Sequence, residues 1–144
     1  MRGLFLANYE AGYGTANAAQ HIERANRDRW LCVQIETLEA VEHADEIAAV
    51  EGVDSLFVGP SDLSSALGVP GQAMHPKCIA ALERVASAVK KAGKTWGVLS
   101  RSPEHGAKCL ELGCQLFSLA GDVDLIHRGL QSTKALYADF FKES

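Results

Sequence analysis

Four short apolar segments, each followed by a stretch with helical periodicity, constrain the fold of this chain more than any other feature. They span residues 31–36, 55–58, 95–99 and 115–119, and their length and pattern are those of β-strands. Consecutive strands separated by helices need crossover connections, which produce a parallel sheet. The carboxyl ends of such strands lie at one edge of the sheet. The sequence therefore predicts an α/β fold with its strand exits gathered at that edge.

Start and stop signals delimit the helices. Thr15 is expected to cap a first helix, Thr37 to cap the segment after the first strand, and Asp45 to recap that segment. A histidine-proline pair at His75 and a serine-proline pair at Ser102 begin two further helices, because proline is favoured at the first helical position. The helices expected from these signals span residues 15–28, 37–51, 76–92 and 103–112, and a last one begins near residue 122.

Composition sets the broad class of the protein. The 144 residues are 47% hydrophobic and 22% charged with a net charge of -4, which suits one domain with a real core. The acidity and the lack of a basic stripe argue against a nucleic-acid partner. No apolar run reaches the roughly 18 residues of a membrane span. The four cysteines form no C-x-x-C pair, so we expect reduced, mostly buried thiols and a cytoplasmic protein.

Two architectures fit this order of elements. Four parallel strands with flanking helices could form a small doubly wound domain, or they could be half of a (β/α)8 TIM barrel. A whole barrel needs at least about 200 residues, more than the 144 present. Composition and periodicity leave both architectures open.

Polar residues at two successive strand exits are candidates for a metal site. Gln34 and Glu36 share one face of the first strand, and Asp62 follows the second strand in the stretch Gly59-Pro60-Ser61-Asp62. Two carboxylates at one edge would suit a hard divalent cation such as Mg²⁺ or Mn²⁺. A surface ion pair for Glu36 and a helix cap for Asp62 are the alternative explanation.

The stretches 33–37, 45–54 and 56–64 resemble the HpcH/HpaI aldolase family. The match rests on Val-Gln-Ile-Glu-Thr in the first stretch and Gly-Pro-Ser-Asp-Leu in the third, and Leu67-Gly68, His75-Pro76 and Ala92-Gly93-Lys94 continue it. It covers roughly residues 10–130. The resemblance implies a metal-dependent (class II) pyruvate aldolase, which cleaves 4-hydroxy-2-keto acids to pyruvate and an aldehyde. It also implies a TIM barrel, of which residues 1–144 would form part of one domain.

The resemblance also implies roles for four residues. Glu36 and Asp62 match the family's metal ligands, with Mg²⁺, Mn²⁺ or Co²⁺ as the cofactor. Gln34 matches the glutamine that contacts the substrate, and Ser61 and Asp62 match the residues whose backbone N–H groups receive the pyruvate carboxylate. A cation and fixed N–H donors would stabilise the charge that develops on the keto oxygen.

The family's catalytic histidine and arginine have no match in this chain. The resemblance places both upstream of Met1, so we expect the carboxyl-terminal half of the barrel, with no catalytic residue of its own and negligible activity alone. A catalytically inactive half-barrel that binds metal, keto acid or a partner stays open as an alternative, as does an acyl-CoA lyase of the malyl or citramalyl type. Unpaired strand edges in a half-barrel predict a homo-oligomer, such as two halves joined in a barrel-like dimer, and the alternative is a chain that requires a separately supplied first half.

Overall fold

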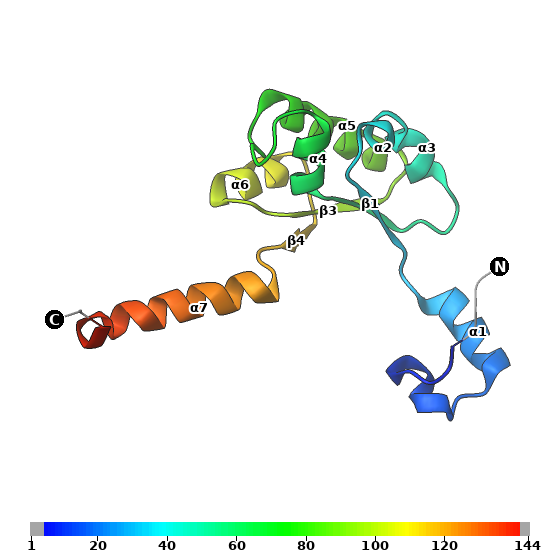
Figure 1. Cartoon of the computed structure of the whole chain (residues 1–144). Coiled ribbons are helices and arrows are strands. Elements are labelled where there is room, and N and C mark those ends of the chain that lie inside the picture. The colour runs from blue at the N-terminus through cyan, green and yellow to red at the C-terminus, as the bar shows by residue number, and fades with distance from the viewer. Residues whose placement is uncertain (1–4, 142–144) are drawn as a thin grey trace. The chain divides into compact units, whose positions relative to one another are not determined.

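The structure is a computed structural model that describes residues 5–141 (Figure 1). It consists of two compact units, with the boundary between Leu31 and Cys32. The described helices include none that is both long enough and apolar enough to cross a membrane.

The first unit consists of a 3-10 segment, η1 (Tyr9–Gly14), and helix α1 (Ala18–Asp28). Asn17 caps α1 by accepting a hydrogen bond from the backbone N–H of Gln20. The expected cap, Thr15, instead donates its hydroxyl to the carbonyl of Gly12 at 2.8 Å. The helix therefore begins later than the sequence predicted, because the threonine hydroxyl is engaged in the preceding turn.

The second unit contains the predicted parallel sheet. Its strands are β1 (Cys32–Ile35), β2 (Ser55–Val58), β3 (Thr95–Leu99) and β4 (Leu116–Ser118). They pair in the order β1-β2-β3-β4, and every pair is parallel. The α/β fold and the positions of all four strands are thus as predicted, each to within a residue or two.

Most of the helix starts also agree with the prediction. Thr37 and Ser102 accept capping hydrogen bonds at the starts of α2 and α6. Helix α3 begins after His43, so Asp45 lies inside its first turn and does not cap it. The Asp45 carboxylate instead forms an ion pair with Arg84 of α5 at 2.7 Å. The helices of this unit are α2 (Leu38–Glu42), α3 (Ala44–Ala49), α4 (Pro60–Ala66), α5 (Pro76–Lys91), α6 (Pro103–Glu111) and α7 (Asp122–Leu136), followed by the 3-10 segment η2 (Ala138–Phe141).

The core lies between one face of the sheet and the helices. Helices α2 to α6 lie on the same side of the sheet in Figure 1. Sheet residues with no more than 1% exposure meet the apolar stripe of α5, which includes Leu82, Val85 and Val89. Burying each such side chain contributes about 1.5–3 kcal/mol. The sheet residues concerned are Ile35, Leu56, Val58, Trp96 and Val98.

Helix α7 differs from the other helices of the second unit because none of its residues is buried. Its apolar side chains are all more than half exposed, and Phe140 in η2 is 81% exposed beside Tyr137, with the ring centroids 5.8 Å apart. The exposed apolar residues of α7 include Leu125, Ile126 and Leu130.

The cysteines are free thiols, as the sequence predicted. Cys78, Cys109 and Cys114 are buried and Cys32 is half-buried. Burial raises the pKa of the Cys109 thiol to about 12, so this side chain stays protonated and behaves as a small apolar residue.

Candidate functional site

The exits of β1 and β2 lie side by side. Ile35 and Val58, the last residues of the two strands, are register partners. The backbone N–H of Gly59 continues the ladder by donating to the carbonyl of Ile35 at 3.0 Å. Glu36 and Gly59 therefore leave the sheet next to each other at its carboxyl edge.

The Glu36 carboxylate is held by its own strand. The Gln34 amide nitrogen donates to Glu36 Oε2 at 2.8 Å, which is possible because residues two apart in a strand point to the same face. Gln34 is exposed and Glu36 is half-buried. The hydrogen bond orients the carboxylate and engages one of its two oxygens.

Gly59 leaves the space that these two side chains occupy. A Cβ at this position would lie 2.8 Å from Gln34 Nε2, 3.1 Å from Glu36 Oε2 and 3.3 Å from Glu36 Cβ. The φ of Gly59 is -91°, which any residue can adopt. Glycine is needed here for the close approach of backbone and side chains, and not for an unusual backbone angle.

Asp62 and Ser61 lie in the first turn of α4, after Gly59 at the N-cap and Pro60 at the first helical position. Neither is the cap, since the N-cap position belongs to Gly59, which has no side chain to provide one. Backbone N–H groups in a first helical turn have no partner within the helix, so those of Ser61 and Asp62 can receive an anion. The Asp62 side chain is exposed and makes no hydrogen bond or ion pair within residues 5–141.

The donor set fits a hard divalent cation. Carboxylate oxygens are the ligands that Mg²⁺ prefers, and it is commonly held by only one or two of them, with water and substrate oxygens completing its shell. Residues 5–141 contain no group of three or more histidine, cysteine, aspartate or glutamate side chains that could hold an ion. Glu36 and Asp62 would therefore form an open site and not a closed cage.

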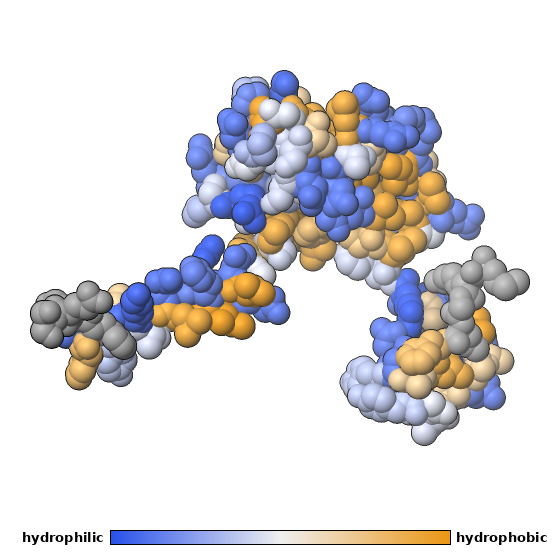
Figure 2. Space-filling model, viewed as in Figure 1, coloured by the Kyte–Doolittle hydropathy of each residue, from blue (hydrophilic) through white to orange (hydrophobic). Residues whose placement is uncertain are grey.

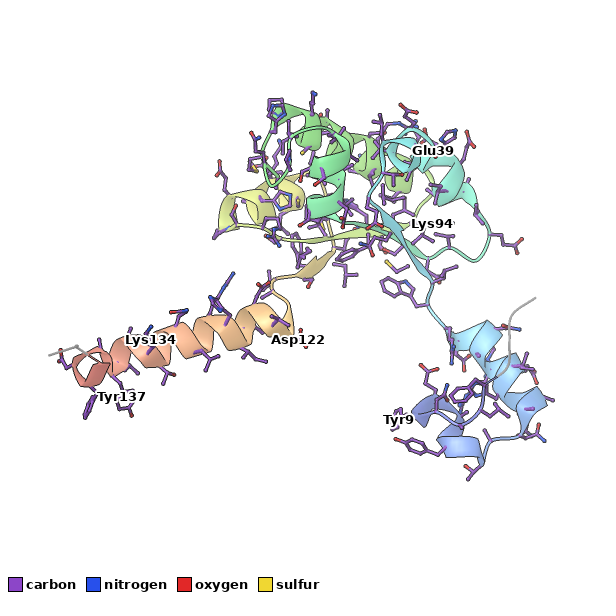
Figure 3. All side chains as sticks on the ribbon, viewed as in Figure 1. Tyr9, Glu39, Lys94, Asp122, Lys134 and Tyr137 are labelled. Carbon is purple, nitrogen blue, oxygen red and sulfur yellow. The ribbon has the colours of Figure 1, made fainter. Side chains whose placement is uncertain are left out.

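The other two strand exits are engaged in local structure. After β3, the backbone N–H of Ser100 donates to the Ser118 carbonyl at 2.8 Å, and the Ser100 hydroxyl donates to the Ser102 carbonyl at 2.9 Å. After β4, Asp122 begins α7 and its carboxylate accepts the N–H of Val123 at 2.8 Å (Figure 3). The candidate ligands at this edge therefore belong to the β1 and β2 exits.

Three histidines of the second unit have structural contacts. The Nδ1 atom of His75 caps α5 by accepting the backbone N–H of Lys77. The Nδ1 atom of His43 lies 2.9 Å from the carbonyl oxygen of Glu39. His105 is 1% exposed, accepts from the backbone N–H of Arg101, and lies 3.7 Å from Cys109 Sγ. Burial, with a smaller contribution from Arg101, lowers the pKa of His105 and keeps it neutral.

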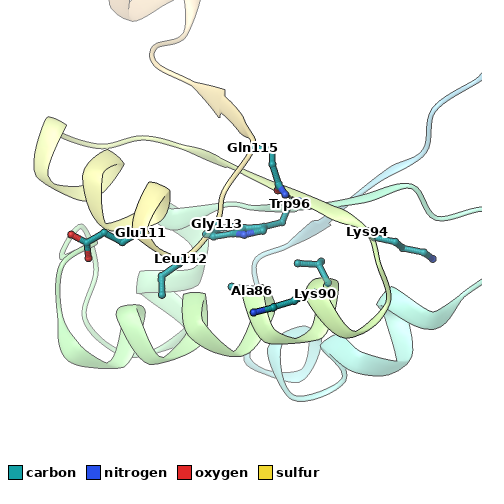
Figure 4. A pocket seen from close by; sticks show the side chains of 9 residues that line it. Ala86, Lys90, Lys94, Trp96, Glu111, Leu112, Gly113 and Gln115 are labelled. Carbon is teal, nitrogen blue, oxygen red and sulfur yellow. Dashed lines mark hydrogen bonds between the residues drawn. The ribbon is translucent and has the colours of Figure 1, made fainter.

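A separate hollow of about 440 Å³ lies between α5 and α6 (Figure 4). Lys94 and Gln115, which precede β3 and β4, line it, so it opens at the amino ends of the strands. Lys94 Nζ donates to the Val50 carbonyl at 2.8 Å. This hollow is at the opposite edge from Glu36 and is not part of the candidate site.

Comparison with known proteins identifies relatives of the whole core. The sequence model of the HpcH/HpaI aldolase/citrate lyase family matches residues 9–128. A hydroxypyruvate/pyruvate aldolase of Pseudomonas aeruginosa is 40% identical over 115 residues, which are 80% of this chain and 43% of the relative. A 4-hydroxy-2-oxo-heptane-1,7-dioate aldolase of Shigella flexneri is 34% identical over 119 residues, 83% of this chain and 45% of the relative.

The fold comparison agrees with the sequence comparison. A crystal structure of an HpcH/HpaI aldolase/citrate lyase family protein from Burkholderia cenocepacia superposes with a TM-score of 0.80 at 30% identity, covering 96% of this chain and 53% of that one. The chain thus spans about half the length of the relatives it matches, and its four parallel strands correspond to half of the TIM barrel of that family. By its sequence and its fold, the chain belongs to the HpcH/HpaI aldolase/citrate lyase family.

Proposed function

We propose that this chain carries the metal-binding and keto-acid-binding part of a class II pyruvate aldolase. The reaction would be the reversible cleavage of a 4-hydroxy-2-keto acid to pyruvate and an aldehyde. The observation that carries the proposal is the position of the Glu36 carboxylate next to the turn that leads to Asp62. This carboxylate accepts a hydrogen bond from Gln34 and fits closely against Gly59, where a Cβ would collide with it.

Each of these residues has a defined task in the proposal. Glu36 and Asp62 would hold the divalent cation, which supplies positive charge for the keto oxygen of the substrate. Backbone N–H groups of Ser61 and Asp62 would bind the substrate carboxylate. Gln34 fixes the orientation of the Glu36 carboxylate and, being exposed, can also contact the substrate.

The proposed reaction would need these groups at one site. Cleavage breaks the C3–C4 bond, and its electron pair moves toward the C2 carbonyl, so negative charge develops on the keto oxygen. The hydroxyl proton at C4 must leave at the same time, and we assign no residue of this chain to receive it. The described groups therefore bind and polarise the keto acid, and we expect the 144-residue chain alone to release negligible pyruvate.

Thermal unfolding with ligands tests the binding site directly. Mn²⁺ together with oxalate, which resembles the enolate of pyruvate, should raise the melting temperature, because ligand at about 100 times its Kd stabilises a protein by about 2.7 kcal/mol. Glu36→Ala should abolish the metal-dependent part of the shift. Glu39→Ala is the matched control, since Glu39 is an exposed glutamate on α2. Equal shifts in both variants would contradict the proposed site.

The rival activity is that of an acyl-CoA lyase of the malyl or citramalyl type, since the family model includes citrate lyases. The two relatives described above carry aldolase names at 40% and 34% identity, which supports the aldolase. Assays with a 4-hydroxy-2-keto acid and with a malyl-CoA-type thioester would separate the two activities. Metal-dependent pyruvate release by the 144-residue chain would contradict the expectation that it is inactive alone.

A further inference from the structure

Ser64 is a polar residue on the buried side of α4. Its exposed fraction is 0%, whereas its neighbour Ser65 is exposed to solvent. The Ser64 hydroxyl donates to the carbonyl of Ser61 at 2.8 Å and accepts the backbone N–H of Gly71 at 3.0 Å. Because a buried hydroxyl without partners destabilises a protein, a serine at this position depends on these two hydrogen bonds.

The contact with Gly71 distinguishes Ser64 from an ordinary helical serine. Serine within a helix commonly donates to a carbonyl three or four residues earlier, as Ser65 does to Ser61 at 3.0 Å. Ser64 in addition receives an N–H from the loop that follows the helix, and its backbone carbonyl accepts the N–H of Val69 at 2.9 Å. Two hydrogen bonds thus fasten the loop 67–71 to one residue of α4.

The loop is also held against the core helix α5. The Leu67 carbonyl accepts a hydrogen bond from Lys77 Nζ at 3.3 Å. His75, which caps α5, donates its backbone N–H to the Gln72 carbonyl at 2.9 Å. The hydrogen bonds of Ser64 therefore connect the start of α4 with a segment that the start of α5 holds in place.

The carbonyl that accepts the Ser64 hydroxyl belongs to the peptide that leads into Asp62. The Ser61 carbonyl, the Asp62 nitrogen and the Asp62 Cα lie in one planar peptide unit, so a bond to the carbonyl limits rotation of the whole unit. Fixing this plane fixes the point from which the exposed Asp62 side chain extends. The surface where α4 begins is mostly hydrophilic (Figure 2), which suits a carboxylate that faces water and a polar ligand.

We propose that Ser64 is a positioning residue that holds Asp62 where it can share one cation with Glu36. This role rests on the proposed function, in which these two carboxylates bind a divalent metal ion. A functional site needs its groups held within about 0.5 Å of the productive geometry, and the Asp62 side chain makes no hydrogen bond or ion pair within residues 5–141 that could hold it. Groups that orient metal ligands typically contribute about 10–100-fold to metal affinity.

Titration of the 144-residue chain with Mn²⁺, followed by the electron paramagnetic resonance signal of the free ion, tests this role without an assay of activity. Ser64→Ala should raise the Kd for Mn²⁺ by about tenfold. Ser65→Ala is the matched control, because it removes a bond to the same Ser61 carbonyl at an exposed position where water can replace the hydroxyl. It should leave the Kd unchanged.

The same titration separates a positioning role from a structural one. A lower melting temperature of Ser64→Ala with an unchanged Kd would show that Ser64 only stabilises the fold, and would overturn the inference. Equal losses of affinity in Ser64→Ala and Ser65→Ala would overturn it as well. Binding of Mn²⁺ by the wild type but not by Glu36→Ala would support the proposed site whatever Ser64 does. No binding by the wild type would refute the proposed function and this role with it.

Amide hydrogen exchange of the wild type, followed by NMR, covers the case in which Ser64→Ala does not fold. Linkage is reciprocal: if the bond between Ser64 and Gly71 favours metal binding, metal binding must favour that bond. Saturating Mg²⁺, which is diamagnetic, should therefore slow exchange of the Gly71 N–H by about tenfold. The Gly113 N–H, which donates to the Leu110 carbonyl at 2.9 Å after α6, is the control and should exchange at the same rate throughout. Equal rates at Gly71 with and without Mg²⁺ would overturn the inference.

Discussion

Gly97→Ala gives the sharpest test of how closely β3 packs against β4 and against Phe57 of β2. Gly97 lies in the middle of β3, and a Cβ at this position would be 2.7 Å from the Leu116 carbonyl oxygen, 2.8 Å from Leu116 Cβ and 2.9 Å from Phe57 Cδ2. Two of these three atoms belong to the backbone of β4 or are attached directly to it, so a change of rotamer cannot relieve the contact. Strand β4 has to move away from β3.

The expected loss of stability follows from the rigidity of these neighbouring backbone atoms. Overpacking a well-packed site typically costs about 1–3 kcal/mol, and we expect Gly97→Ala to lower the free energy of unfolding by an amount in this range. Urea denaturation measures it, with the fluorescence of Trp96, which is 1% exposed, as the report on the core. A Trp30→Phe background removes the signal of the other tryptophan, which is 55% exposed.

Gly129→Ala is the matched control. Gly129 lies within α7, and an added Cβ would meet no heavy atom within 4 Å. The same substitution should there raise helix stability by up to about 1 kcal/mol, because alanine is the better helix former. If Gly97→Ala left the urea midpoint of the core unchanged, the close packing of β3 against β4 and Phe57 would be refuted.

Two further predictions concern the candidate site and the buried histidine. Gly59→Ala should weaken the stabilisation by Mn²⁺ and oxalate, because the new methyl group displaces Gln34 and Glu36. Gly121→Ala is the control and should leave the stabilisation unchanged, since the atom nearest to an added Cβ there is 3.8 Å away. An undiminished melting shift in Gly59→Ala would contradict the proposed role of this glycine. For His105, burial lowers the pKa in the folded state, so the unfolded chain binds the proton more readily and stability should fall as the pH drops through the unfolded value of about 6.5. His105→Gln should flatten that slope in urea titrations between about pH 8 and pH 5, and an equally steep slope in the variant would assign the effect to other groups.

The sequence by itself was sufficient to predict the class of fold. The alternation of residues 31–36, the proline at the start of α5 and the caps Thr37 and Ser102 are local signals, and each depends on backbone geometry that a few neighbouring residues determine. The parallel order of the strands followed from the helices between them, because such connections have to cross over. The resemblance to the aldolase family rested on two such local motifs, and the family comparison confirms it.

Tertiary structure decided the contacts of residues for which local signals compete. Asp45 is a good capping residue by sequence, but it pairs with Arg84 of α5, a partner that no local pattern contains. The crowding around Gly59 likewise depends on β1 and β2 being neighbours, which brings Gln34 and Glu36 against a residue far along the chain. Secondary structure is encoded within short windows, whereas ion pairs and close packing depend on distances between segments that only the folded chain brings together.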